Sequence, residues 1–206
     1  MCKTFYIIDD HEMLRLGTSG WITSNSDWKC CGCAGTHEAA FADFERMAGQ
    51  GSLPAVLICD LNFYGENTGF NFMAEIHSLY PAVKIIVYSM FFAAGIVQSA
   101  VSSGACGYVS KNASCAQLLE GMEKVLAGET FIQEELQTGL KKYNNFTDAL
   151  TRREKEVMEL LIRRYSNDEI ANQLGIKKRA VENYISLIYE KTGVNDRNEL
   201  LARYGQ

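Results

Sequence analysis

The chain has 206 residues, of which 47% are hydrophobic, and a formal net charge of −5 at pH 7. This composition excludes a disordered polymer, and no run approaches the roughly 18 apolar residues of a membrane span. The first residues, MCKTFYIIDDHE, reach acidic side chains where a secretory signal would need its cleavage site. We therefore expect a cytoplasmic protein with no membrane partner.

Charge is distributed unevenly along the chain. Residues 1–148 hold nine Lys and Arg against sixteen Asp and Glu, whereas residues 149–206 hold eleven against nine. An acidic front and a mildly basic tail indicate two modules with different partners.

Two short apolar runs end at carboxylates. Phe5–Ile8 is followed by Asp9 and Asp10, and Val56–Cys59 is followed by Asp60. Such runs are typical of strands buried on both faces of a parallel sheet. Asp60 by itself is explained as well by a turn that begins after the strand, so other residues must decide its role.

Strands and helices alternate along the first 128 residues. Further strands are expected at residues 28–34, 83–88 and 107–109, and helices at 13–22, 39–47, 70–80, 94–102 and 114–126. Five strands alternating with five helices predict an open, mostly parallel α/β sheet. Such sheets place ligands at the carboxyl ends of their strands, where Asp9, Asp10 and Asp60 would meet Ser89 and Lys111.

The residues at these strand ends suit phosphoryl chemistry. Three converging carboxylates repel one another unless a cation neutralises them, and Mg²⁺ is the natural partner of oxygen ligands. With Mg²⁺ and the Lys111 ammonium nearby, Asp60 can act as a carboxylate nucleophile toward a phosphoryl group. Ser89 can offer its hydroxyl to a phosphoryl oxygen.

Motif order and spacing over residues 1–128 resemble the receiver domain of bacterial two-component response regulators. The matching segments are DD at 9–10, ICDL around Asp60, YSM around Ser89 and GYVSK ending at Lys111. The resemblance implies an α/β, flavodoxin-like (βα)5 fold with parallel sheet order 2-1-3-4-5, in which Asp60 accepts phosphate from a histidine kinase. It also implies that the main-chain carbonyl of Asn62 completes the Mg²⁺ shell and that Tyr108 is the aromatic whose rotamer changes with the switch.

Two positions depart from the usual receiver pattern. Asn62, Phe63 and Tyr64 stand where a Met-Pro pair is common, and Asn112 follows Lys111 where Pro or a small residue is common. Neither departure removes a reacting group, so they concern switching rates rather than the chemistry.

Cys30, Cys31 and Cys33 form a cluster within a predicted strand. Successive strand residues point to opposite faces, and no second CxxC pair or nearby His completes a zinc set. We therefore expect structural thiols rather than a metal or redox site.

The tail is predicted to be helical. Residues 129–148 have the weak periodicity of a linker with one helical piece, and residues 149–206 form the second module. Capping boxes at Thr151–Glu154 and Ser166–Glu169 open two helices, and Gly175 separates the second from a longer helix that begins near Lys178. Short helix, tight turn and longer helix are typical of a helix-turn-helix, here within a small all-α four-helix domain.

The segments LTRREKEVMELL, SNDEIANQLGI and IYEKTGVNDRNELL resemble the LuxR-type DNA-binding domain. Such a tail behind a receiver is typical of the NarL/FixJ subfamily, and it implies that the longer helix binds double-stranded promoter DNA. The residues expected to contact DNA are Lys177, Lys178, Arg179, Val181, Glu182 and Lys191.

Glu182 departs from the family, because a basic residue is usual there and a carboxylate is repelled by phosphate. A carboxylate can still accept a hydrogen bond from cytosine. The alternative is a helix-turn-helix retained for packing, with weak affinity for DNA.

These patterns predict a phosphorylation-controlled transcription regulator, and not an enzyme beyond catalysis of its own phosphorylation and dephosphorylation. The resemblance to the subfamily implies that phosphorylation of Asp60 releases the tail to bind DNA as a homodimer, with the helix near residues 196–204 as the dimer surface. Two alternatives stay open: a phosphorylation-independent regulator, and one whose tail acts through protein partners.

Overall fold

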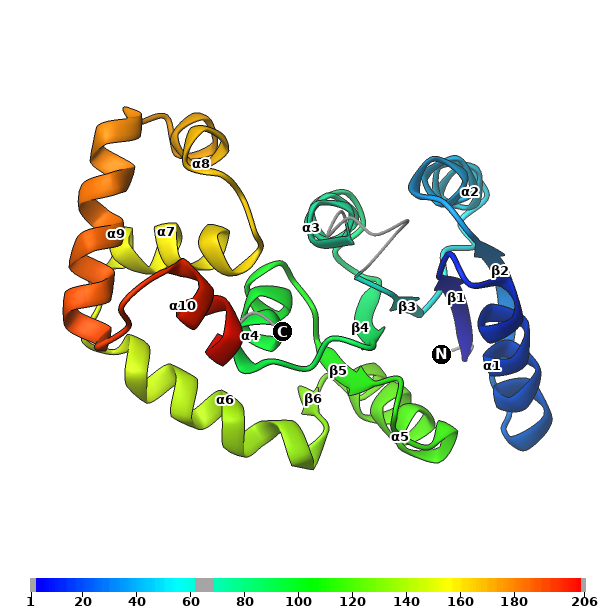
Figure 1. Cartoon of the computed structure of the whole chain (residues 1–206). Helices are drawn as coiled ribbons and strands as arrows, with labels where there is room; N and C mark the ends of the chain where they lie inside the picture. The colour runs from blue at the N-terminus through cyan, green and yellow to red at the C-terminus, as the bar shows by residue number, and fades with distance from the viewer. Residues whose placement is uncertain (1–2, 62–68, 205–206) are drawn as a thin grey trace. The chain divides into compact units, whose positions relative to one another are not determined.

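The computed structural model describes residues 3–61 and 69–204. The chain divides into two compact units, one formed by Met1–Met90 with Ala100–Gln133 and the other by Phe91–Ser99 with Glu134–Gln206. The first unit contains a parallel sheet, and the second is built from helices (Figure 1).

The sheet has six strands within the described residues. They are β1 (Thr4–Ile8), β2 (Lys29–Ala34), β3 (Val56–Cys59), β4 (Lys84–Ser89), β5 (Gly107–Ser110) and β6 (Phe131–Ile132). Their order is β2-β1-β3-β4-β5-β6, and every neighbouring pair is parallel. The predicted flavodoxin-like order is confirmed, and β6 adds a short edge strand in a segment that we expected to be linker.

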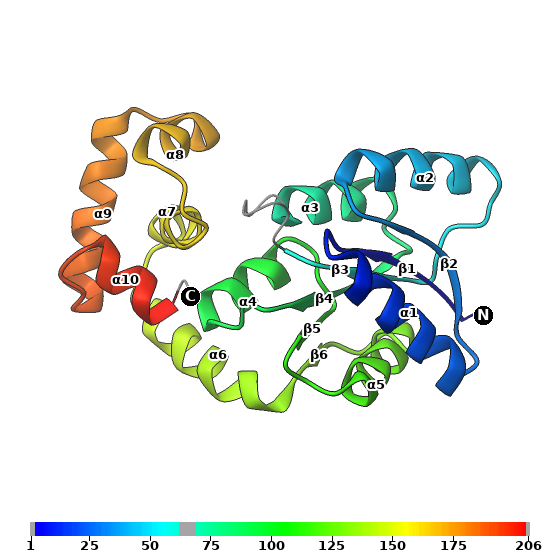
Figure 2. The same ribbon diagram turned by 45° about the vertical axis from the view of Figure 1, so that its right-hand side comes forward.

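Helices cover both faces of this sheet. They are α1 (Glu12–Asn25), α2 (His37–Gly49), α3 (Gly69–Leu79) and α5 (Cys115–Leu126), with α4 (Ala94–Ser102) following β4 in sequence. Figure 2 shows α1 and α5 on one face and α2 and α3 on the other. This arrangement follows from right-handed crossovers between parallel strands.

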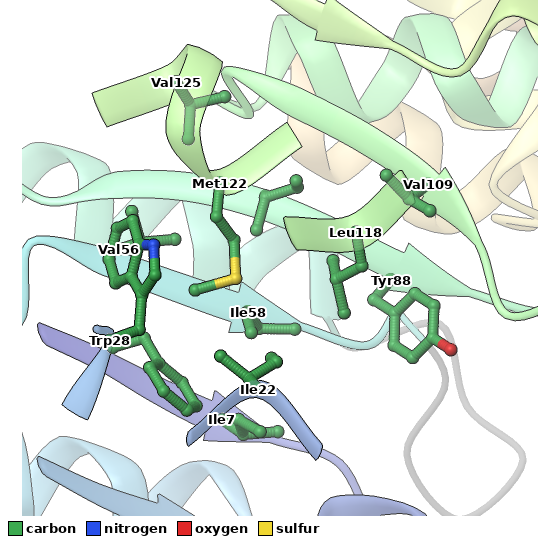
Figure 3. Packing of buried hydrophobic residues seen from close by; sticks show 12 residues of the cluster. Ile7, Ile22, Trp28, Val56, Ile58, Tyr88, Val109, Leu118, Met122 and Val125 are labelled. Atoms are coloured by element: carbon green, nitrogen blue, oxygen red, sulfur yellow. The ribbon is translucent and has the colours of Figure 1, made fainter. Parts of the chain in front are cut away.

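The core beneath α1 and α5 is apolar and closely packed. Ile7 of β1 and Ile58 of β3 lie with Met122 of α5 in one buried cluster (Figure 3). Trp28 is almost fully buried in the same cluster, and its indole Nε1 donates a hydrogen bond to Glu123 at 2.7 Å. This packing holds the strands rigidly, so that the residues at their carboxyl ends are fixed in space.

The second unit contains residues 94–99 of α4 and all the remaining helices. They are α6 (Glu134–Thr147), α7 (Arg152–Ile162), α8 (Asn167–Leu174), α9 (Lys178–Thr192) and α10 (Arg197–Tyr204). Both predicted capping boxes are present, at Thr151 and at Ser166. The segment expected to be linker is largely one helix, α6, because Tyr143 and Phe146 place their rings against Tyr204 of α10.

None of the helices within the described ranges is both long and apolar enough to cross a membrane.

Candidate functional site

Carboxylates from β1 and β3 converge on one lysine. The side chains of Asp9 and Asp60 are only 2% and 4% exposed, and the Lys111 side chain is 3% exposed. The Lys111 Nζ atom lies 2.8 Å from Asp9 Oδ2 and 2.5 Å from Asp60 Oδ2. Two buried carboxylates therefore share one buried ammonium, as expected for three strands that end at the same edge of a parallel sheet.

Main-chain groups fix the second oxygen of each buried carboxylate. The His11 N–H donates to Asp9 Oδ1 at 2.9 Å, and the Leu61 N–H donates to Asp60 Oδ1 at 2.6 Å. Each carboxylate thus accepts one charged and one neutral hydrogen bond, which satisfies buried oxygen atoms and sets their orientation.

The acidic site, defined here as Asp9, Asp10, Asp60 and Lys111, fits a divalent cation. Ligand atoms of Asp9, Asp10, His11 and Asp60 all lie within 4.8 Å of one another. The exposed His11 ring lies 2.7 Å from Asp10 through Nδ1. Three carboxylates against one ammonium leave two negative charges, and oxygen donors with that charge suit Mg²⁺.

Burial and charge act on Lys111 in opposite directions. Burial lowers the pKa of its ammonium, but the attraction of Asp60 and the hydrogen bonds to Asp60 and Asp9 outweigh burial, so the pKa lies above its ordinary value of 10.5. Lys111 is consequently a permanent positive charge between the two carboxylates, ready to stabilise negative charge that develops there.

The other predicted residues occupy neighbouring strand ends. Ser89 is fully buried at the end of β4, and its carbonyl accepts a hydrogen bond from the Lys111 N–H at 2.9 Å. Tyr108 is fully buried within β5, which places its ring inside the unit. Asn62, the expected carbonyl ligand, lies outside the described residues.

Two residues near the acidic site were missed by the motif search. Arg15 of α1 donates a hydrogen bond to the main-chain carbonyl of Asp9. A Cβ added at Gly69 would lie 2.7 Å from the carbonyl oxygen of Asp60, so only glycine lets α3 begin this close to the strand end. A Gly at the start of the helix after β3 was the only sequence signal available.

The helix-turn-helix is present in the second unit. Gly175 ends α8 in the left-handed region with φ 63°, and α9 begins three residues later at Lys178. Val157 of α7, Ile170 of α8 and Ile188 of α9 are fully buried, so the motif has an apolar core of its own.

The predicted DNA contacts fall into two groups. Lys177, Lys178 and Arg179 are exposed at the start of α9, and Lys178 forms an exposed ion pair with Asp168 at 2.8 Å. Val181, in contrast, is fully buried. The expectation that Val181 contacts DNA is therefore wrong, because helical periodicity turns that position toward the core.

Lys191 forms an ion pair with a buried carboxylate of the tail. Its Nζ lies 2.8 Å from both carboxylate oxygens of Glu154, which is 3% exposed. Glu154 also accepts a hydrogen bond from the Thr151 N–H in the capping box. The primary contact of Lys191 in this structure is thus an internal ion pair.

The exposed face of α9 is mixed in character. Glu182 is exposed, as are Asn183, Ser186 and Glu190 on the following turns. Asn183 is an exposed position that the sequence reasoning did not single out, and an exposed Asn on such a helix can form two hydrogen bonds with adenine.

Cys30, Cys31 and Cys33 are free thiols on β2, with Cys31 and Cys33 exposed. The Sγ atoms of Cys30 and Cys31 donate to different main-chain carbonyls, of Gly32 and Phe5. The strand register shifts between Phe5 and Tyr6, opposite these cysteines.

The fold and the acidic site define a flavodoxin-like α/β domain with acidic strand ends, joined to a helix-turn-helix. Residues 5–123 match the response regulator receiver domain family, and residues 148–203 match the bacterial regulatory proteins of the luxR family. The chain therefore belongs to the two-component response regulators with a LuxR-type DNA-binding domain, and acts as a transcription factor. The predicted NarL/FixJ arrangement is confirmed.

Relatives match along almost the whole chain. The transcriptional activator protein ExaE of Pseudomonas putida is 30% identical over 203 residues, covering 95% of this chain and 92% of the relative. The response regulator protein VraR of Staphylococcus epidermidis is 27% identical over 196 residues, covering 93% and 91%.

A solved structure shares the fold. RcsB from Salmonella enterica serovar Typhimurium, bound to promoter rprA in the presence of the phosphomimetic BeF3-, superposes with a TM-score of 0.70 at 20% identity and full coverage of both chains.

Proposed function

We propose that this regulator is switched by phosphorylation of Asp60. The observation that carries the proposal is the buried Lys111 ammonium at the strand ends, 2.5 Å from Asp60 and 2.8 Å from Asp9. A nucleophilic carboxylate, a fixed cation and further acidic ligands are the parts that phosphoryl transfer requires.

The acidic site would hold Mg²⁺ through Asp9, Asp10 and Asp60, with the Asn62 carbonyl as the expected fourth ligand. The ion supplies neutralisation of charge on the phosphoryl oxygens. A carboxylate oxygen of Asp60 forms the new bond to phosphorus, and the bond from phosphorus to the imidazole nitrogen of the kinase histidine breaks. Lys111 and the Ser89 hydroxyl then bind phosphoryl oxygens, and the same residues support the later hydrolysis.

For the tail, we propose binding to promoter DNA through the exposed start of α9. Lys177, Lys178 and Arg179 supply phosphate contacts, while Glu182 and Asn183 face the bases. The RcsB relative was solved bound to a promoter, which supports this assignment.

The active form is proposed to be a homodimer, as in the RcsB dimers solved on DNA. The expected dimer surface is α10, and the rings of Tyr143 and Phe146 from α6 lie against its Tyr204 at 5.2 and 4.6 Å. Release of α6 from Tyr204 would free that part of α10 for a second copy.

The test is incorporation of label from radioactive acetyl phosphate with Mg²⁺. Wild-type chain should become labelled, Asp60→Asn should not, and Asp27→Asn, at an exposed carboxylate paired with Lys3, should behave as wild type. Label on Asp60→Asn would show that another residue is the acceptor. An unlabelled wild type that still binds promoter DNA would favour the phosphorylation-independent alternative.

A tail that acts on a protein partner is a second candidate, favoured by the exposed Glu182 and Glu190 on α9. The negative DNA backbone repels these two carboxylates, whereas a basic protein surface would attract them. A salt-dependent gel shift on promoter DNA that Arg179→Ala abolishes would decide against this candidate.

A further inference from the structure

Gln133 is a buried polar residue at the point in the sequence where the first unit ends. It is 7% exposed, follows β6 directly and is the last residue of the first unit. Glu134, the next residue, begins α6. A buried amide needs hydrogen-bond partners, and its partners lie on β5.

Both ends of Gln133 bind the strand that carries the switch residues. Its main-chain N–H donates to the Tyr108 carbonyl at 3.0 Å, and its side-chain Oε1 accepts the Ser110 N–H at 2.8 Å. In a continued parallel ladder, a main-chain carbonyl would take the Ser110 N–H. Here the chain turns into a helix instead, and the Gln133 side chain extends the ladder by one more hydrogen bond.

The segment that Gln133 holds directly adjoins the acidic site. Ser110 precedes Lys111, and the Lys111 N–H is bonded to the Ser89 carbonyl at 2.9 Å on the other side of β5. Lys111 in turn contacts Asp9 and Asp60. A phosphoryl group on Asp60 would add negative charge beside Lys111, and any displacement of that lysine acts on the main chain of Ser110.

We propose that Gln133 is a positioning residue that transmits the state of the acidic site to α6 through its hydrogen bond to the Ser110 N–H. The inference rests on the proposed function, because it names how phosphorylation of Asp60 is regulated and relayed. Downstream, α6 carries Tyr143 and Phe146 against Tyr204 of α10. The contacts from Lys111 to α6 thus form one continuous chain of hydrogen bonds and covalent bonds.

The test compares full-length variants that differ at the acceptor atom. Gln133→Leu removes the acceptor oxygen but has a similar size, and Gln133→Glu retains an acceptor oxygen. The control Gln50→Leu makes the same chemical change at an exposed glutamine at the end of α2. Hydrogen exchange of the α6 amides is measured with and without beryllium fluoride and Mg²⁺, which mimic the phosphoryl group. Labelling by acetyl phosphate is measured on the same samples.

Wild type, Gln133→Glu and Gln50→Leu should change α6 exchange when beryllium fluoride is added. In Gln133→Leu this response should be about 3- to 30-fold smaller, the range expected for loss of one coupling residue, while labelling of Asp60 persists. A full response in Gln133→Leu would overturn the inference and leave the proposed function intact. An unlabelled wild type would instead refute the proposed function, and this inference with it.

If Gln133→Leu does not fold, Gln133→Asn replaces it. The shorter amide keeps the polarity of the site but cannot reach the Ser110 N–H at 2.8 Å without a main-chain shift. Loss of the α6 response in this variant supports the inference, and a full response refutes it.

Discussion

The ion pair between Lys191 and Glu154 allows a DNA contact to be distinguished from an internal one. Lys191→Met keeps the aliphatic part of the side chain and removes the ammonium. That ammonium lies 2.8 Å from both carboxylate oxygens of Glu154, which is 3% exposed. Leaving a buried charged group without its partner lowers the free energy of unfolding by about 1–3 kcal/mol. The loss should not be larger, because the Lys191 side chain is one-third exposed and water partly screens the ion pair. With a urea m value of about 1 kcal/mol/M for so small a domain, the unfolding midpoint of the tail should fall by roughly 1–3 M.

The assay is urea unfolding of the full chain followed by two signals. Both tryptophans, Trp21 and Trp28, lie in the first unit, so their fluorescence reports the receiver, whereas far-UV circular dichroism also reports the tail. Lys191→Met should shift the unfolding transition of the tail, seen by circular dichroism, and leave the fluorescence transition of the receiver unchanged.

A matched control is Lys178→Met, which makes the same change at an exposed position. It should leave stability nearly unchanged and reduce the salt dependence of DNA binding by about 0.9 in slope, the contribution of one phosphate contact. Lys191→Met should leave that slope as in wild type. An unchanged midpoint together with a reduced slope for Lys191→Met would refute the internal role and identify Lys191 as a DNA contact.

Three further predictions concern burial and charge. The His37 ring stacks on Phe72 with 4.8 Å between ring centroids, and burial lowers the pKa of its imidazole below 6.5. Because the unfolded chain then binds more protons than the folded one, the receiver should lose stability as pH falls through 6.5. Urea titrations at several pH values should show a smaller loss in His37→Gln. Val181→Ala should destabilise the tail by about 2 kcal/mol without changing the DNA affinity of the folded protein, because it removes buried methyl groups from a fully buried side chain. Lys111→Met should destabilise the receiver by about 3–5 kcal/mol in Mg²⁺-free buffer, because the buried carboxylates of Asp60 and Asp9 lose their cation. Addition of Mg²⁺ should restore stability, because the ion binds the folded state. Identical fluorescence-detected midpoints for that variant and wild type without Mg²⁺ would contradict the last prediction.

Local patterns were sufficient for most of the fold. Four consecutive apolar residues at 56–59 and a following Asp predicted β3 and its polar end, because a strand buried on both faces is apolar throughout and a carboxylate marks where that run stops. Capping boxes at Thr151 and Ser166 predicted two helix starts correctly, since their hydrogen bonds form within four residues.

The burial of single side chains could not be predicted from local sequence patterns. Val181 lies between Arg179 and Glu182, and family position alone suggested a DNA contact, whereas packing buries it fully. The partner of Lys191 is 37 residues away in sequence. No local pattern encodes such a pairing, because it depends on how α7 and α9 cross.

The acidic site shows the same division. The sequence alone determined which residue types end each strand, and parallel topology brings strand ends together, so the grouping of Asp9, Asp60 and Lys111 could be predicted. Only the tertiary structure decided that Lys111 bridges both carboxylates, and that Gln133, which follows an unpredicted sixth strand, holds the adjoining Ser110. The reason is physical: strand patterns arise from neighbours along the chain, whereas these contacts join residues 51 and 23 positions apart and exist only once the sheet has formed.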